Sequence, residues 1–257
     1  MEYCGEDSGW DIVDSSVLED AIFKLKLRVA EHVGVQKGMI VVDVGCGQGG
    51  FTASLAKIVG EGGKVLAVDV SDEYLAEFMG RLDRYGVRNR VTFLHADGAN
   101  LRHVITDDFA DMVVSFRVIE ELKTPVDMPK IIGEMVRVAK KGGKVCLTEL
   151  STEARNKAEE VYIRLHRESG DFFPEPKEIL ELMKRCGLEA VRVENFGTDV
   201  WLSPSLAKQH LSFAQVWFDV DVERNLGSLI DTYGMKYPEL LVFSGQRCAR
   251  GNGGGVR

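Results

Sequence analysis

The chain lacks any long uninterrupted apolar run. No stretch approaches the roughly 20 apolar residues that a membrane-spanning helix needs. Its first ten residues carry acidic side chains, where a secretory signal would be basic and then apolar. The sequence therefore predicts no membrane span and a cytoplasmic location.

The sequence also lacks an excess of positive charge and any regular pattern of cysteines. Its 40 acidic residues outnumber its 32 lysines and arginines, giving a net charge of -8, which disfavours a nucleic-acid partner. The five cysteines are scattered and none forms a Cys-x-x-Cys pair, which argues against a disulfide framework and a zinc cage. We therefore expect reduced thiols and no bound metal.

What the 257 residues do contain is a regular alternation of apolar runs with segments of helical composition. Such alternation is typical of a parallel sheet with helices on both faces. With two more strands expected at Leu188–Phe196 and Leu240–Ser244, we predict an α/β, Rossmann-like, doubly wound sheet of seven mostly parallel strands. The five alternating runs are Ile40–Val44, Val65–Val70, Val91–Leu94, Met112–Phe116 and Val145–Leu150.

The glycine pairs and the regions outside this alternation predict how the chain is divided. Gly142-Gly143 is expected to end a helix before the fifth strand, and residues 151–169 are expected to form one charged helix.

A helical extension (1–34) precedes a main domain (35–248), and the glycine-rich tail (249–257) is predicted to be disordered. Two inserts, 151–176 and 197–239, interrupt the main domain. The aromatic second insert forms either a lid or a surface for a homodimer, and both alternatives stay open.

The sharpest motif joins the first apolar run to a glycine-rich turn and a helix. Strand Ile40–Val44 continues into Gly45-Cys46-Gly47-Gln48-Gly49-Gly50. Glycines let a ligand approach the backbone closely, and a helix N-terminus favours an anionic group. Asp43 stands where a dinucleotide-binding strand normally has an apolar residue. A carboxylate there suits a ligand that carries an ammonium or sulfonium cation.

These residues resemble the first motif of the class I S-adenosylmethionine-dependent methyltransferases, acid-x-Gly-x-Gly-x-Gly, over about residues 35–196. Arg137–Gly143 resembles a segment of the methyltransferase type 11 subfamily, which includes ubiquinone and menaquinone C-methyltransferases. The sequence departs from that pattern at Lys141, where proline is usual. Glu120-Glu121 stand where many members have histidine, so a histidine-based mechanism is not carried over.

The resemblance implies a role for two further acids at strand ends. Asp69 matches the carboxylate that binds the ribose hydroxyls, and Asp97 matches the acid that binds adenine. S-adenosylmethionine is therefore the expected cofactor and S-adenosylhomocysteine the expected product. The expected cofactor-binding residues are Asp43, Gly45, Cys46, Gly47, Gly49, Asp69, Val70, Ala96, Asp97, Gly98, Ser115 and Phe116.

The acceptor is expected over the carboxyl ends of the fourth and fifth strands, where ligands bind in such sheets. An in-line methyl transfer needs positioning and exclusion of water, and a base only where the acceptor must lose a proton. Glu120 and His166 are the best candidate catalytic residues among several weak ones that include Glu149 and His210; Arg117 is a candidate anchor for an acidic substrate.

The leading hypothesis is thus a methyltransferase that acts on a small molecule. Two alternatives remain: an enzyme of the same class with a protein or RNA acceptor, and a non-catalytic scaffold protein that binds S-adenosylmethionine. An NAD-linked oxidoreductase ranks last, because an acid at position 43 repels a pyrophosphate.

Overall fold

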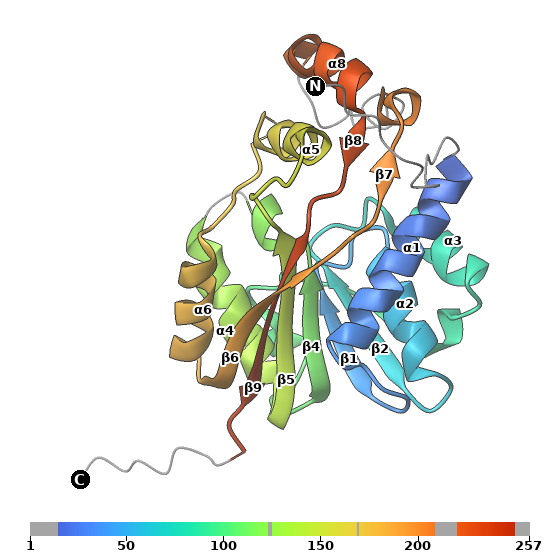
Figure 1. The fold of residues 1–257 in the computed structure, drawn as a ribbon. Helices are drawn as coiled ribbons and strands as arrows, with labels where there is room; N and C mark the ends of the chain where they lie inside the picture. The colour runs from blue at the N-terminus through green and yellow to red at the C-terminus, as the bar shows by residue number, and fades with distance from the viewer. Residues whose placement is uncertain (1–14, 123–124, 169, 209–219, 250–257) are drawn as a thin grey trace. The chain divides into compact units, whose positions relative to one another are not determined.

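The computed structural model describes residues 15–122, 125–168, 170–208 and 220–249 (Figure 1). Within these ranges, no helix has both the length and the apolar character required to cross a bilayer. His210 and residues 250–257 of the predicted disordered tail lie outside the described residues.

A seven-stranded sheet confirms the predicted fold class. Its strand order is β3-β2-β1-β4-β5-β9-β6. Neighbours from β3 through to β5 are parallel, whereas β9 runs antiparallel to both β5 and β6. The strands are β1 (Ile40–Val44), β2 (Lys64–Asp69), β3 (Val91–His95), β4 (Ala110–Phe116), β5 (Ala139–Leu150), β6 (Leu188–Phe196) and β9 (Leu240–Arg247).

Helices cover both faces of this sheet, as Figure 1 shows for α4 and α6 on one side and for α2 and α3 on the other. On the first side, apolar residues of α4 and α6 form a buried cluster with the central strands. The helices are α1 (Ser15–His32), α2 (Gly50–Val59), α3 (Leu75–Arg84), α4 (Met128–Val138), α5 (Lys157–Glu168), α6 (Pro176–Arg185) and α8 (Val220–Tyr233), with short 3-10 turns η1 (Arg88–Arg90), η2 (Leu101–His103), η3 (Ile119–Glu121) and η4 (Pro125–Asp127).

The central strands form where the sequence is richest in β-branched residues. Four of the five residues of β1 are Ile or Val, and Val41, Val42 and Val44 are almost fully buried. A strand between two parallel neighbours has both faces covered, so it must be apolar along its whole length. Asp43 is the exception in β1, which marks it as a residue with a task other than packing.

Two sequence predictions about element boundaries were wrong. Gly142-Gly143 does not end a helix: α4 ends at Val138, and β5 begins at once at Ala139 and carries both glycines through a register shift against β4. The predicted charged helix does not begin at residue 151 but at Lys157, because the Asn156 side chain accepts a hydrogen bond from Glu159 N and caps the helix there.

The chain divides into two compact units. The sheet unit comprises Lys26–Leu150, Phe172–Phe196 and Leu240–Arg257, and therefore includes the second half of α1. The helical unit comprises Met1–Leu25, Ser151–Asp171 and Gly197–Glu239. Within the helical unit, α5 and α8 accompany a two-stranded sheet of β7 (Trp201–Leu202) and β8 (Met235–Lys236).

Buried side chains hold the helical unit together around α5. The ring of Tyr162 packs against Tyr237 with 4.6 Å between centroids. Glu159, almost fully buried, is paired with Lys236 Nζ at 3.0 Å, and Thr198 Oγ1 donates to Tyr237 O at 2.7 Å. These interactions join the first insert to the segment that follows residue 197.

Candidate functional site

The loop between β1 and α2 takes a shape that glycine alone permits. Gly45, Gly47 and Gly49 all have positive φ, a region that other residues rarely adopt. A Cβ on Gly45 would lie 2.4 Å from Val118, and one on Gly49 would lie 2.5 Å from Phe78. The side chains of Val118 and Phe78 therefore occupy the space that a Cβ would need at these two positions. At Gly47 a Cβ would meet nothing within 4 Å. The loop is therefore packed on two sides and open at its centre.

The Asp69 carboxylate fixes the open centre of this loop. Its Oδ2 accepts from Gly47 N at 2.7 Å, and its Oδ1 accepts from Ser71 N at 3.0 Å. Each carboxylate oxygen has a second lone pair, so both retain capacity for another donor. The last residue of β2 thus ties the glycine loop to the neighbouring strand and presents two acceptor oxygens beside Gly47.

Asp43 is a buried carboxyl group with one satisfied oxygen. Its Oδ2 accepts from Thr52 Oγ1 at 2.6 Å, while Oδ1 has no hydrogen-bond partner among the described residues. Burial raises the pKa of Asp43 to about 7, although Thr52 and the charge of Lys26 oppose the rise. An unsatisfied buried carboxyl oxygen costs free energy, which a cationic or hydrogen-bonding ligand would recover.

The turn after β3 is fastened to the same strand ends. Ala96 N donates to Asp69 O at 2.8 Å, and a Cβ on Gly98 would lie 2.8 Å from Val44 of β1. The exposed Asp97 accepts from Ala99 N at 2.8 Å, which shapes the turn. The hydrogen bond from Ala96 N to Asp69 O therefore holds the turn that carries Asp97 beside the end of β2.

The remaining predicted cofactor residues fall into exposed and buried groups. Val70 leaves 68% of its surface exposed directly after Asp69, which is unusual for a large apolar residue. Cys46 and Ser115 are buried, and Ser115 Oγ has no hydrogen-bond partner within the described part of the chain. The ring of Phe116 packs against Phe51 of α2 with 4.9 Å between centroids. Burial raises the pKa of Cys46 above its usual range, so its thiol stays protonated.

A charged cluster occupies the ends of β4 and β5. Arg117, which has a positive φ of 59°, donates from Nε to Glu120 Oε1 at 2.5 Å. The other oxygen of Glu120 accepts from Leu150 N at 3.2 Å. Both oxygens of this candidate catalytic residue are therefore engaged, and its carboxylate is nearly fully buried.

Glu149 lies beside this ion pair. Its Oε1 accepts from Ile119 N at 3.3 Å, and its Oε2 is buried without a hydrogen-bond partner among the described residues. Burial, together with the neighbouring charge of Glu120, holds the pKa of Glu149 well above its usual range. Two buried carboxyl groups with one arginine between them are most stable when one carboxyl keeps its proton, and Glu149 is that group.

His166, the other candidate catalytic residue, belongs to the helical unit. Its Nδ1 lies 2.6 Å from Asp171 Oδ2, and its ring stacks on Tyr162 at 4.7 Å between centroids. A carboxylate on one ring nitrogen fixes the orientation and tautomer of an imidazole. Glu120 lies in the sheet unit, and the catalytic role of each of the two residues stays a prediction.

Lys26 of α1 is a site residue that the sequence interpretation missed. Its Nζ lies 5.2 Å from the centroid of Phe116, and a Cβ on Gly50 would come within 2.7 Å of it. The ammonium group therefore reaches the first turn of α2. The signal was present in the sequence, because Lys26 interrupts the apolar stripe of its helix between Ile22 and Val29.

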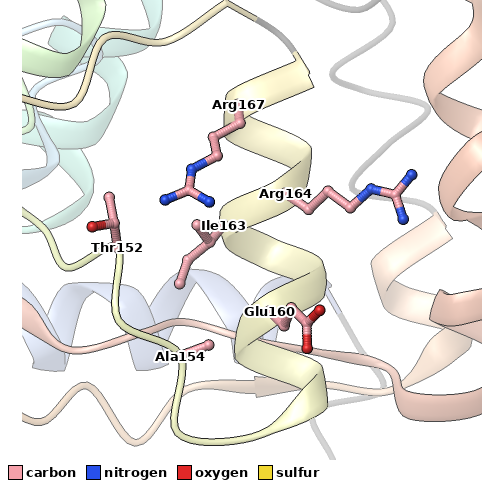
Figure 2. A pocket seen from close by; sticks show the side chains of 6 residues that line it. All are labelled: Thr152, Ala154, Glu160, Ile163, Arg164 and Arg167. Atoms are coloured by element: carbon pink, nitrogen blue, oxygen red, sulfur yellow. The ribbon is translucent and has the colours of Figure 1, made fainter.

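The helical unit contains a small cavity of about 160 Å³ beside α5 (Figure 2). Figure 2 shows the side chain of Arg167 turned toward Thr152, whereas Arg164 points away from it. Small-molecule sites typically enclose roughly 300–1,000 Å³, so this cavity is too small for an acceptor with a cofactor beside it. We therefore assign it no substrate. Its lining residues are Thr152, Ala154, Glu160, Ile163, Arg164 and Arg167.

Comparison with known proteins finds similarity to methyltransferases over more than half of the chain. A family model described as a methyltransferase domain matches residues 35–187. A ubiquinone/menaquinone biosynthesis C-methyltransferase of Haemophilus ducreyi is 26% identical over 188 residues, covering 65% of this chain and 71% of that protein. A demethylmenaquinone methyltransferase of Bacillus cereus is 29% identical over 209 residues, covering 73% and 85%.

The fold likeness extends over nearly the whole chain. The crystal structure of a cyclopropane-fatty-acyl-phospholipid synthase-like protein from Lactobacillus casei superposes with a TM-score of 0.68 at 16% identity. The match covers 92% of this chain and 94% of that one. At this identity the likeness shows the fold, while the family model spans more than half of the chain, enough to assign the family.

Proposed function

The chain belongs to the class I S-adenosylmethionine-dependent methyltransferases, and from that premise we propose that its methyl acceptor is a small molecule. The single observation that carries the cofactor site is the hydrogen bond from Gly47 N to the Asp69 carboxylate at the open centre of the glycine loop. The preference for a small acceptor is supported by the names of the relatives, which describe enzymes of quinone biosynthesis, and by the net charge of -8.

The residues at this edge of the sheet fit S-adenosylmethionine. The unsatisfied Oδ1 of Asp43 suits the positively charged amino-acid portion, and the two oxygens of Asp69 suit a pair of ribose hydroxyls. The exposed side chain of Val70 would offer an apolar surface to the adenine, and the exposed carboxylate of Asp97 would accept from its amino group. The product that leaves this site is S-adenosylhomocysteine.

The bound cofactor supplies a methyl group on a sulfonium sulfur, which a nucleophilic atom of the acceptor attacks in line. The chain's contribution is to hold the acceptor, exclude water and take up a proton where the acceptor must lose one. Holding two reactants in line replaces a bimolecular encounter, and such positioning is worth roughly 7–11 kcal/mol. No protein nucleophile is required, in agreement with the protonated thiol of Cys46.

At the acceptor end we assign different roles to the two glutamates. Glu120 is engaged by Arg117 and Leu150 N, so we propose that it positions Arg117 and does not itself move a proton. Glu149 has a buried unsatisfied oxygen and a raised pKa, which makes its ionised form the stronger base, so it is the carboxyl group better suited to take up a proton from an acceptor. His166, oriented by Asp171, remains the proposed base from the helical unit.

We further propose that the helical unit serves as the lid that the sequence predicts. Support comes from its composition: it gathers the first 25 residues, most of the first insert and the whole aromatic second insert. Self-association through the second insert remains the alternative role for this segment.

The test is transfer of labelled methyl in a cell extract. The purified protein is incubated with S-[methyl-³H]adenosylmethionine and extract, and small molecules are separated from protein and nucleic acid. We expect a labelled small-molecule product distinct from S-adenosylmethionine, absent with extract alone and with an Asp69→Ala variant. Label confined to protein or RNA would replace the proposed acceptor with a macromolecule. Cofactor binding without any transfer would favour a scaffold protein.

A further inference from the structure

The side chain of Lys26 occupies an unusual place for a cation. It extends from the second half of α1, is partly buried, lies over the ring of Phe116 and ends against Gly50, in the first turn of α2. Within the described ranges, no hydrogen bond or ion pair to Nζ is formed. The amide groups of a helix's first turn also carry partial positive charge. An ammonium group thus points at a place that is already electropositive.

The charges around Lys26 make this arrangement costly when no ligand is present. Burial and the positive charges of Arg81 and Arg117 together lower the pKa of Lys26 to about 8, against the opposing effects of Asp43 and Glu121. The other groups that face this region are Asp69 of β2 and the Thr52 hydroxyl. Among the described residues, Asp43 and Glu121 act on Lys26 through their charge, and neither of them forms an ion pair with its Nζ.

We infer that Lys26, together with the first-turn amides of α2, binds the carboxylate of the cofactor's amino-acid portion, while Asp43 binds the ammonium group of the same portion. The inference rests on the proposed cofactor site and adds a specificity residue to it. An α-amino acid is a zwitterion, and the Lys26–Asp43 pair offers one charge of each sign beside the same loop. Asp43 Oδ1 is unsatisfied within the described residues, so it has capacity for the ammonium group of a ligand.

This arrangement makes Lys26 a residue that distinguishes the complete cofactor from fragments of it. S-adenosylhomocysteine carries the amino-acid portion, whereas 5′-methylthioadenosine keeps the adenine, the ribose and the sulfur but lacks both charges. Only the first ligand can use Lys26. A general defect of the loop would instead weaken both ligands.

The experiment is calorimetric titration of the full chain with each of these two ligands at pH 7. In Lys26→Met, which keeps an unbranched apolar stem over Phe116, we expect the affinity for S-adenosylhomocysteine to fall about 10- to 100-fold. The affinity for 5′-methylthioadenosine should change less than about threefold. Lys26→Arg, which keeps the charge, should retain most of the affinity for S-adenosylhomocysteine.

The matched control is Lys24→Met, which removes an exposed lysine from the same helix and should alter neither affinity. The pH dependence gives a second readout. As the pH rises through the pKa of Lys26 the free ammonium loses its proton, so binding of S-adenosylhomocysteine to the wild type should weaken above pH 8, and this part of the pH dependence should be absent in Lys26→Met.

Equal weakening of both ligands in Lys26→Met, or no weakening of either, would overturn the inference. If the wild type binds neither ligand, the proposed cofactor site fails instead, so the two failures are distinguishable. Should Lys26→Met not fold, the comparison of Lys26→Arg with Lys26→Gln on the same two ligands decides the question.

Discussion

The two halves of the sheet's carboxyl edge are built differently. At the end of β2 and in the turn after β3, backbone amides bind aspartate side chains, as Gly47 N and Ser71 N do with Asp69 and Ala99 N does with Asp97. At the ends of β4 and β5, side chains bind one another: Arg117 pairs with Glu120 next to Glu149. A site made from backbone depends on glycine and chain geometry and leaves a motif in the sequence. A site made from side-chain pairs leaves none.

The two halves also differ in how their carboxyl groups are stabilised. The carboxylate of Asp69 has donors for both of its oxygens, whereas the β4–β5 half contains two buried carboxyl groups and one arginine. Stability should therefore respond most to changes in the β4–β5 half, and cofactor affinity to changes in the β1–β3 half. Four substitutions test this division.

The largest effect is expected from Glu120→Ala. The substitution leaves the partly buried guanidinium of Arg117 and the buried amide of Leu150 without their acceptor. Breaking a buried pair by removing one partner costs about 3 kcal/mol. Urea denaturation measures the free energy of unfolding. Glu160→Ala, at an exposed site of α5, is the control, and a loss below about 1 kcal/mol for Glu120→Ala would contradict the buried ion pair.

Gly45→Ala tests the backbone half and should destabilise the protein by about 2 kcal/mol. The added Cβ would meet Val118 at 2.4 Å on a residue with positive φ. Gly86→Ala is the matched control, because Gly86 has a positive φ of 64° and nothing within 4 Å of its Cβ position. Thermal melting of both variants separates steric contact from backbone strain. Equal losses of stability in the two variants would mean that the Val118 side chain moves aside and does not restrict the loop at position 45.

Glu149→Gln should change how stability depends on pH. The pKa of Glu149 is raised in the folded state above its ordinary value of 4.5, so its neutral form stabilises the fold at low pH and this contribution is lost as the pH rises. The amide cannot ionise. As the pH rises from 5 to 6, we expect the free energy of unfolding of the variant to increase by about 1.4 kcal/mol relative to that of the wild type, as measured by urea denaturation. A difference that does not change with pH would show that Glu149 ionises freely.

The smallest effect is expected from Val70→Ala, in the β1–β3 half. Removing two methyl groups from the proposed adenine surface should weaken S-adenosylhomocysteine binding by about 1 kcal/mol, or roughly fivefold, without changing stability. Val126→Ala is the control, since Val126 is equally exposed at 68%. Unchanged calorimetric affinity in Val70→Ala would remove Val70 from the adenine site.

The difference between the two halves also explains what the sequence predicts and what it does not. The limits of Ile40–Val44 and Leu188–Phe196 were predicted as the structure has them, because their apolar pattern is bounded by turn residues. The beginning of β5 was missed, since a glycine pair such as Gly142-Gly143 is compatible both with the end of a helix and with a bulged strand. The pairing of Arg117 with Glu120 depends on a turn that brings residues three apart together, and no period in the sequence announces it.

Lys26 shows a third kind of limit. Its position in the apolar stripe can be read from the sequence. The residues that its side chain contacts cannot, because Gly50 and Phe116 lie far from it along the chain. Such a residue is found only when the packing of the helix against the sheet is known. The roles of Asp69 and Asp97, in contrast, were predicted from motifs that resemble a known family, and that of Asp43 from its place before the glycine-rich turn, all of which can be read in the sequence.

The most direct test of the account is a calorimetric titration of the purified chain with S-adenosylhomocysteine and, separately, with NAD. If the glycine loop and the aspartates of β1, β2 and the turn after β3 bind a sulfonium nucleoside, S-adenosylhomocysteine should bind saturably at one site per chain and NAD should give no saturable heat. Saturable NAD binding with no heat from S-adenosylhomocysteine would contradict the account.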